Sequence, residues 1–184
     1  VDFKAQLEAG AIAFSDDGMP VENARMIREA LLEANKLGTF VAEHCEEKSV
    51  SAGAINAGPI ARRLEVEGVL PEAEEIMAAR DIVLAETNNL HAHICHISTK
   101  TSVDMIRSAK QRGVKVTCET CPHYYSFTVE EVLESGVNAK MNPPLREEKD
   151  RLAIIEGIKD GTIDCVITDH APHAEEEKAR GLAT

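Results

Sequence analysis

The chain has 184 residues, enough for one domain with a hydrophobic core. Its 20 Lys and Arg residues face 32 Asp and Glu residues, and the resulting net charge of −12 argues against nucleic acid as a partner, because phosphate binding needs clustered cations. No apolar stretch approaches a membrane span, no signal peptide is recognisable, and five Cys residues without a secretory context favour a reducing, cytoplasmic compartment.

Strand-like and helical segments alternate along the chain. An apolar segment at 11–14 runs into an acidic turn, and apolar residues at helical spacing then predict a helix over about 21–36. A strand over about 39–43 follows and ends at His44. The remaining predicted strands are 90–95, 114–119 and 163–168, and the remaining predicted helices are 71–86, 101–111 and 147–159.

Repeated strand–helix units predict a mostly parallel sheet and therefore an α/β fold. Aromatic residues make up only 3% of the chain, so the core is expected to consist of aliphatic side chains, as in buried parallel strands. A closed barrel needs eight parallel strands, and the pattern provides about five. The sheet is either open and doubly wound, or part of a barrel. Residues 47–71 are expected to be an irregular loop, and the acidic runs 72–75 and 175–177 to be solvated helix faces.

Four of the strand-like segments end in residues that can bind metal ions or move protons. These residues are Asp16 and Asp17, His44, His96, and Asp169 with His170 and His173. Because the carboxyl ends of parallel strands meet at one edge of a sheet, these side chains are expected to lie together. His and carboxylate groups are common zinc ligands, so the pattern predicts a metallohydrolase site.

Each of these positions also has a purely structural interpretation. The acidic turn could be an ordinary Asp-Gly turn. His96 is preferred to His93 as a ligand because it lies nearer the end of its strand, and His93 is expected to pack or cap. The pair Cys118 and Cys121 lacks the second pair that a structural zinc needs, and a redox role is disfavoured because Cys118 lies in a strand.

Five motifs together resemble the type I dihydroorotases, which are cyclic amidohydrolases built on a distorted (β/α) barrel. They occur in the family's order and at its approximate spacing. The motifs are Ser15-Asp16-Asp17-Gly18, Glu43-His44-Cys45-Glu46, Cys95-His96-Ile97-Ser98-Thr99, Lys140-Met141-Asn142-Pro143-Pro144-Leu145-Arg146 and Thr168-Asp169-His170-Ala171-Pro172-His173. The resemblance implies a partial TIM-like (β/α) barrel with about five of its eight parallel strands.

The resemblance also implies a metal site with two zinc ions. Asp17, rather than Asp16, would be the metal-bridging carboxylate, since its spacing to His44 fits the family better. His44 and His96 would ligate one of the two ions, and Asp169 would be both a ligand and the proton-transferring base. Hydantoinases and allantoinases usually place a carboxylated Lys where this chain has Asp17, which favours dihydroorotase over them.

The implied reaction is the reversible hydrolysis of the cyclic amide of dihydroorotate to N-carbamoyl-aspartate in pyrimidine biosynthesis. Zinc would supply hydroxide at neutral pH and polarise the carbonyl, and Asp169 would pass a proton to the leaving ring nitrogen. Asn142 and His173 would bind the pyrimidine ring or its carboxylate. A homo-oligomer or aspartate transcarbamoylase would be a protein partner.

The chain departs from the family at its ends. No His precedes His44, so the family's N-terminal His-x-His pair and the Arg that follows it are missing from this sequence. Residues 1–184 are therefore expected to be the central and C-terminal portion of a metal-dependent amidohydrolase barrel domain, inactive when isolated. The alternatives are a non-catalytic dihydroorotase-like scaffold of aspartate transcarbamoylase, or an amidohydrolase acting on hydantoin or allantoin.

Overall fold

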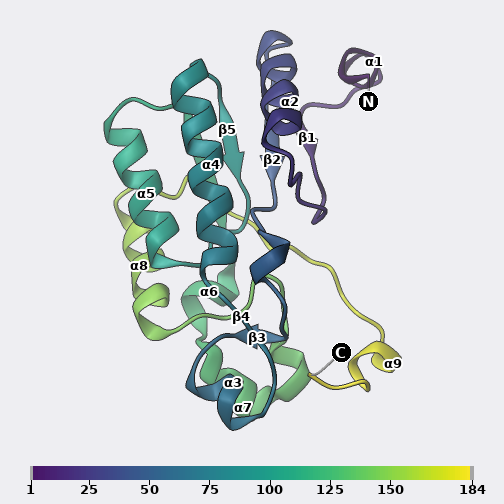
Figure 1. Cartoon of the computed structure of the whole chain (residues 1–184), viewed down its shortest axis with the longest axis vertical. Coiled ribbons are helices and arrows are strands. Elements are labelled where there is room, and N and C mark those ends of the chain that lie inside the picture. The colour runs from purple at the N-terminus through teal and green to yellow at the C-terminus, as the bar shows by residue number, and fades with distance from the viewer. Residues whose placement is uncertain (1, 183–184) are drawn as a thin grey trace.

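The computed structural model describes residues 2–182, and its centre is a five-stranded, wholly parallel sheet (Figure 1). The strand order is β1-β2-β5-β6-β7, so each strand pairs with the next one along the chain that belongs to this sheet. Five predicted strands and their parallel arrangement are thus confirmed. The strands are β1 (Phe14–Ser15), β2 (Val41–Glu43), β5 (Ala92–Ile94), β6 (Val116–Thr120) and β7 (Cys165–Val166).

Four longer helices connect these strands, as predicted, and Figure 1 shows α4 in front of the sheet with α5 and α8 beside it. Their starts follow from local chemistry. The side chain of Asn23 accepts hydrogen bonds from the first free N–H groups of α2, and that of Thr99 does so for α5. The helices are α2 (Ala24–Lys36), α4 (Glu72–Asn88), α5 (Lys100–Gln111) and α8 (Glu148–Lys159).

The expectation of an irregular loop over 47–71 is wrong in part. This segment forms a small two-stranded parallel sheet of β3 (Ile55–Asn56) and β4 (Gly68–Val69), joined by α3 (Pro59–Arg63). A Cβ atom at Gly68 would lie 2.4 Å from the Cα of Ala57, so only glycine allows the two strands to approach this closely. The same segment begins with the short helix η1 (Lys48–Val50). The short elements outside it are α1 (Phe3–Glu8), α6 (Pro122–Ser126), η2 (Val129–Glu131), α7 (Val132–Ser135), η3 (Gly136–Ala139) and α9 (Glu175–Lys178).

The two faces of the sheet differ in burial. Alternate residues of β5 and β6, such as Ile94 and Cys118, are fully buried in the core that the helices cover. The residues between them, such as His93, Thr117 and Glu119, point to the opposite face and are only half-buried. The opposite face is therefore polar, and we call it the inner face.

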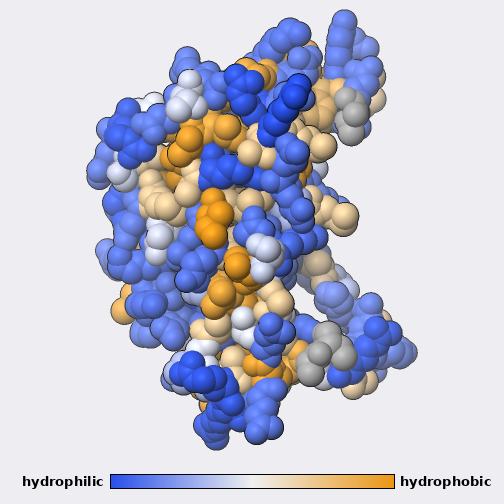
Figure 2. Space-filling model, viewed as in Figure 1, coloured by the Kyte–Doolittle hydropathy of each residue, from blue (hydrophilic) through white to orange (hydrophobic). Residues whose placement is uncertain are grey.

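The outer surface is mostly polar, as Figure 2 shows, with apolar side chains gathered over α4. Ile76 and Val83 of that helix are 49% and 54% exposed. Among the helices formed by residues 2–182, none is both long and apolar enough to cross a membrane.

We expect the helix-covered core to dominate stability. Ile154 of α8 is 0% exposed, and Ile154→Ala should lower the free energy of unfolding by about 2–5 kcal/mol, because it removes buried methylene groups and leaves a cavity. Leu152 lies on the same helix and is 49% exposed, so Leu152→Ala is the matched control and should change it by less than about 1 kcal/mol. Urea denaturation of both variants measures the difference, and equal losses would contradict this assignment of the core.

Candidate metal centre at the carboxyl ends of the strands

Two buried histidines face each other where neighbouring strands end. His44 follows β2 and His96 follows β5, and these strands pair in register with Glu43 beside Ile94. The chain turns at His96 with a left-handed φ of 34°. As a result Nδ1 of His44 lies 2.9 Å from Nε2 of His96, and both residues are less than 10% exposed.

Glu46 fixes the ring of His44 from the other side. Its Oε2 lies 2.9 Å from Nε2 of His44 and accepts a hydrogen bond from Nδ2 of Asn142 at 3.2 Å. The hydrogen bond with His44 lowers the pKa of Glu46 to about 2, so the carboxylate is ionised at neutral pH and Nε2 of His44 must be the donor. The other ring nitrogen of His44, Nδ1, faces His96.

The environment of His96 favours a neutral ring. Burial is the largest cause that lowers the pKa of His96, so His96 is uncharged at neutral pH. Its Nδ1 is buried without a hydrogen-bond partner among the described residues. Two imidazoles that present nitrogen atoms to each other are the donor set that zinc and similar divalent ions prefer.

The acidic turn after β1 lies at the same edge of the sheet. Asp16 accepts hydrogen bonds from the backbone N–H of His44 at 3.0 and 3.1 Å and so holds the start of the His44 segment in place. Burial raises the pKa of Asp16. Asp17 is exposed, with a left-handed φ of 50° and its own N–H bound to Ser15.

Asp169 reaches this edge from the other end of the sheet. It follows β7, is exposed, and has a left-handed φ of 47°. Its negative charge acts on His96, where it opposes the fall in pKa, so the carboxylate lies within electrostatic reach of the histidine pair. The described structure thus brings His44 into contact with His96 and Asn142, and places Asp17 and Asp169 after the two outermost strands, β1 and β7.

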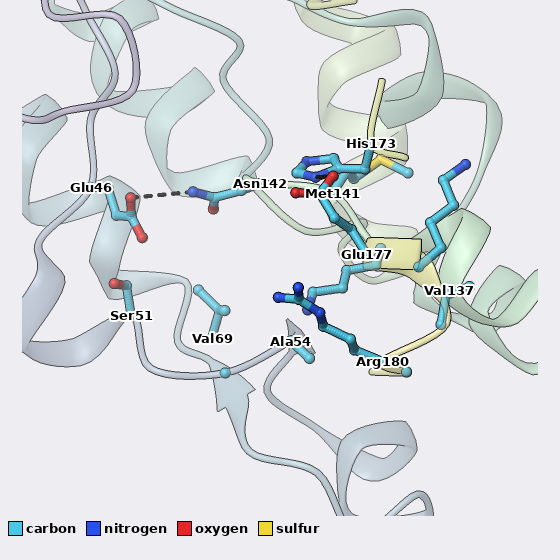
Figure 3. Close-up of a pocket in the computed structure, with 14 residues that line it drawn as sticks. Glu46, Ser51, Ala54, Val69, Val137, Met141, Asn142, His173, Glu177 and Arg180 are labelled. Atoms are coloured by element: carbon cyan, nitrogen blue, oxygen red, sulfur yellow. Dashed lines mark hydrogen bonds and ion pairs between the residues drawn. The ribbon is translucent and has the colours of Figure 1, made fainter. Parts of the chain in front are cut away.

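A cavity of about 440 Å³ opens beside this pair, on the far side of Glu46 and Asn142 (Figure 3). Its opposite wall comes from the segment around α9, with His173 and Arg180. His173 is exposed, and its Nδ1 lies 3.3 Å from Oε2 of Glu177. Polar and apolar side chains share the lining, which suits a small polar ligand.

Behind His96, a buried network holds the turn that follows β5. Glu74 of α4 is 3% exposed, so the expectation that this acidic run is solvated is wrong for Glu74. Its carboxylate accepts the backbone N–H groups of Ser98 and Thr99 at 3.1–3.2 Å, and the Ser98 hydroxyl also donates to it. The guanidinium of Arg146 lies 4.0 Å away and donates to Ser98 and Asn56.

Glu46 and Glu74 are the residues that the sequence did not single out as parts of this centre. Glu46 lies two positions after His44, and that spacing was an available signal. The side chains of Cys118 and Cys121 are both buried free thiols.

The chain is similar in sequence to proteins of a known family. A family model described as "Dihydro-orotase-like" matches residues 1–102. The dihydroorotase of Aquifex aeolicus (strain VF5) is 50% identical over 177 residues, which are 96% of this chain and 42% of the relative. That of Pelotomaculum thermopropionicum (strain DSM 13744 / JCM 10971 / SI) is 53% identical over 172 residues, 93% of this chain and 40% of the relative. The chain therefore spans about two fifths of the length of these relatives.

Solved structures agree on the fold. The L-hydantoinase (dihydropyrimidinase) of Arthrobacter aurescens superposes with a TM-score of 0.80 at 21% identity, over 97% of this chain and 42% of that structure. A D-hydantoinase superposes with a TM-score of 0.76 at 27% identity, over 96% of this chain and 41% of that structure. The expected partial (β/α) barrel is thereby confirmed, and the open doubly wound alternative is excluded.

Glu74→Ala should destabilise the chain by about 3–5 kcal/mol, because it leaves Arg146 buried without its counter-charge and frees the N–H groups of Ser98 and Thr99. Glu75→Ala is the matched control on the same helix, where the side chain is half-buried. It should change the free energy of unfolding by about 0.5 kcal/mol or less. Urea denaturation of the two variants measures their free energies of unfolding, and similar losses in both would argue against this network.

The Glu46–His44 hydrogen bond should make the free energy of unfolding depend on pH in the acid range. Because folding lowers the pKa of Glu46 from 4.5 to about 2, the stabilisation by this hydrogen bond is complete above pH 4.5 and is lost as the pH falls towards 2. The stability advantage of the wild-type chain over Glu46→Gln should therefore shrink between these pH values. Denaturation at a series of pH values measures it, and a constant difference would show that Glu46 is not held by His44.

Proposed function

The chain belongs to the dihydro-orotase-like family, and we propose that it carries the metal-binding part of a dihydroorotase. The enzyme would reversibly hydrolyse the cyclic amide of dihydroorotate to N-carbamoyl-aspartate. The observation that carries this proposal is the pair His44 Nδ1 and His96 Nε2, which face each other at 2.9 Å at adjacent strand ends. Membership of an amidohydrolase family makes metal dependence the general expectation for this pair.

The residues present fit a divalent metal. Ligands about 2.0–2.1 Å from a tetrahedral zinc ion lie about 3.3 Å apart, close to the separation of the two ring nitrogens. We propose two zinc ions per complete site, held by His44, His96, Asp17 and Asp169, with Asp17 as the bridging carboxylate. Bound zinc would polarise the amide carbonyl and lower the pKa of water to about 7.

The chain's own side chains would perform the remaining tasks. Asp169 would accept a proton from the attacking water and deliver it to the leaving ring nitrogen. Asn142 and His173, which both line the cavity, would bind the pyrimidine ring or its carboxylate. Glu46 would keep the proton of His44 on Nε2, and so leave Nδ1 free to act as a ligand.

Two other functions are alternatives to this proposal. A non-catalytic scaffold for aspartate transcarbamoylase needs no ligands, whereas here two histidines are buried in contact at the expected position. Hydantoinases share the fold, but the relatives that are about 50% identical are dihydroorotases. Hydrolysis assays on the full-length protein with dihydroorotate and with hydantoin or allantoin separate these possibilities.

The substrates, the protein partner and the cellular location of the enzyme are also proposals. The substrate pair is dihydroorotate and N-carbamoyl-aspartate, and a second copy of the protein or aspartate transcarbamoylase would be the protein partner. A reducing, cytoplasmic location is supported by five cysteines that are all free thiols. Residues 1–184 would form the central and C-terminal part of the barrel domain, and we expect negligible activity from them alone, since the first two metal-binding histidines of the family are not among them.

Asp169→Asn in the full-length protein should reduce kcat for dihydroorotate by at least about 100-fold, because an amide cannot accept the proton, while much of the bound zinc remains. Glu176→Gln, an exposed substitution on α9 outside the cavity lining, is the matched control and should retain activity. Steady-state kinetics and elemental analysis measure both quantities. Wild-type turnover by Asp169→Asn would contradict the assignment of the base.

A further inference from the structure

A second group of metal-binding side chains lies on the inner face of the sheet. His93 and Cys95 are two positions apart and so point to the same side, and Glu119 lies on the adjacent strand β6. One potential ligand atom from each of the three residues lies within 4.8 Å of the other two. None of them belongs to the His44–His96 centre, and the sequence analysis expected His93 only to pack or cap.

The separation of the first two ligands suits a shared cation. Nε2 of His93 lies 3.2 Å from Oε2 of Glu119, close to the roughly 3.3 Å between ligands on a tetrahedral zinc ion. The two side chains are 11% and 16% exposed, so water competes only weakly for them. The carboxylate is also ionised, because the hydrogen bond with His93 contributes to a lowered pKa of Glu119 despite its burial.

Thr117 orients the imidazole. Its Oγ1 lies 2.8 Å from Nδ1 of His93, on the side of the ring away from Glu119. In the metal-free chain Nε2 of His93 donates its proton to Glu119. With a metal ion bound, the ring proton would instead lie on Nδ1, where this hydroxyl accepts it, and the lone pair of Nε2 would bind the ion. Hydrogen bonds of this kind set the tautomer and the direction of histidines that bind metals.

The surroundings disfavour a free thiolate at Cys95. Burial, and then the negative charge of Glu119, raise the pKa of its thiol. A divalent ion beside the sulfur would offset both effects and stabilise the thiolate. Sulfur, imidazole and carboxylate together are a donor set for zinc rather than for magnesium or calcium.

We propose that His93 Nε2, Cys95 Sγ and Glu119 Oε2 form a binding site for zinc or a similar divalent transition-metal ion, separate from the His44–His96 centre. On binding, the Cys95 thiol releases its proton to solvent, and a metal–sulfur bond forms without change of oxidation state. Water completes a four-coordinate ion. The proposal does not depend on the dihydroorotase activity, since it concerns different side chains on a different face.

Cobalt(II) titration of the zinc-free chain tests this directly, because only a thiolate ligand gives an intense near-ultraviolet sulfur-to-cobalt charge-transfer band. We expect this band in the wild type and its loss in Cys95→Ser. Cys165→Ser is the matched control, since that thiol also lies near Glu119, with Sγ 3.8 Å from Oε2. The charge-transfer band should persist in Cys165→Ser. Thr117→Val should weaken cobalt binding about 10–100-fold by releasing the His93 ring.

Three results would overturn the proposal. They are no charge-transfer band in the wild type at saturating cobalt, an undiminished band in Cys95→Ser, or loss of the band in Cys165→Ser alone. Far-ultraviolet circular dichroism checks folding. If Cys95→Ser does not fold, His93→Gln replaces it, and wild-type cobalt affinity in that variant would refute the site. The His44→Asn variant should keep the band, which separates this site from the His44–His96 centre.

Discussion

The arrangement of the centre depends on one buried carboxylate. Glu74 reaches from α4 to the turn after β5 and accepts the N–H groups of Ser98 and Thr99, which would otherwise be buried without partners. Arg146 balances its charge and ties the same turn to the small sheet through Asn56. The turn that carries His96 is thus fixed from a helix, a second sheet and a distant loop, so the imidazole meets His44 in a set geometry.

The alternation of side-chain direction along β5 explains how one strand provides residues to two groups of ligands. His93 and Cys95 point to the inner face because they are two residues apart, whereas the left-handed turn at His96 directs its ring to His44. The sequence spacing alone predicted that His96 belongs to the metal centre and that His93 packs or caps. The structure shows instead that each histidine has its own set of polar neighbours, with Glu119 and Thr117 around His93.

The sequence predicted the strand ends well, because βα units bring them to one edge regardless of detail. His44 and His96 were found in this way, and the match of motifs to a family added Asn142, which contacts Glu46. The metal-binding roles of His44, His96, Asp17 and Asp169 and the substrate-binding role of Asn142 remain predictions, and Asp17 and Asp169 are exposed at that edge. The burial of Glu74 was missed because its partners lie 24 and 25 residues away, and no local pattern reports such a contact.

The most direct test of the metal centre is ¹⁵N NMR of the histidine rings while zinc is added to the chain. We expect zinc to shift the signals of Nδ1 of His44 and Nε2 of His96 together, while Nε2 of His44 keeps its proton and its hydrogen bond to Glu46. Zinc binding that leaves both rings unchanged, or that removes the proton from Nε2 of His44, would contradict it.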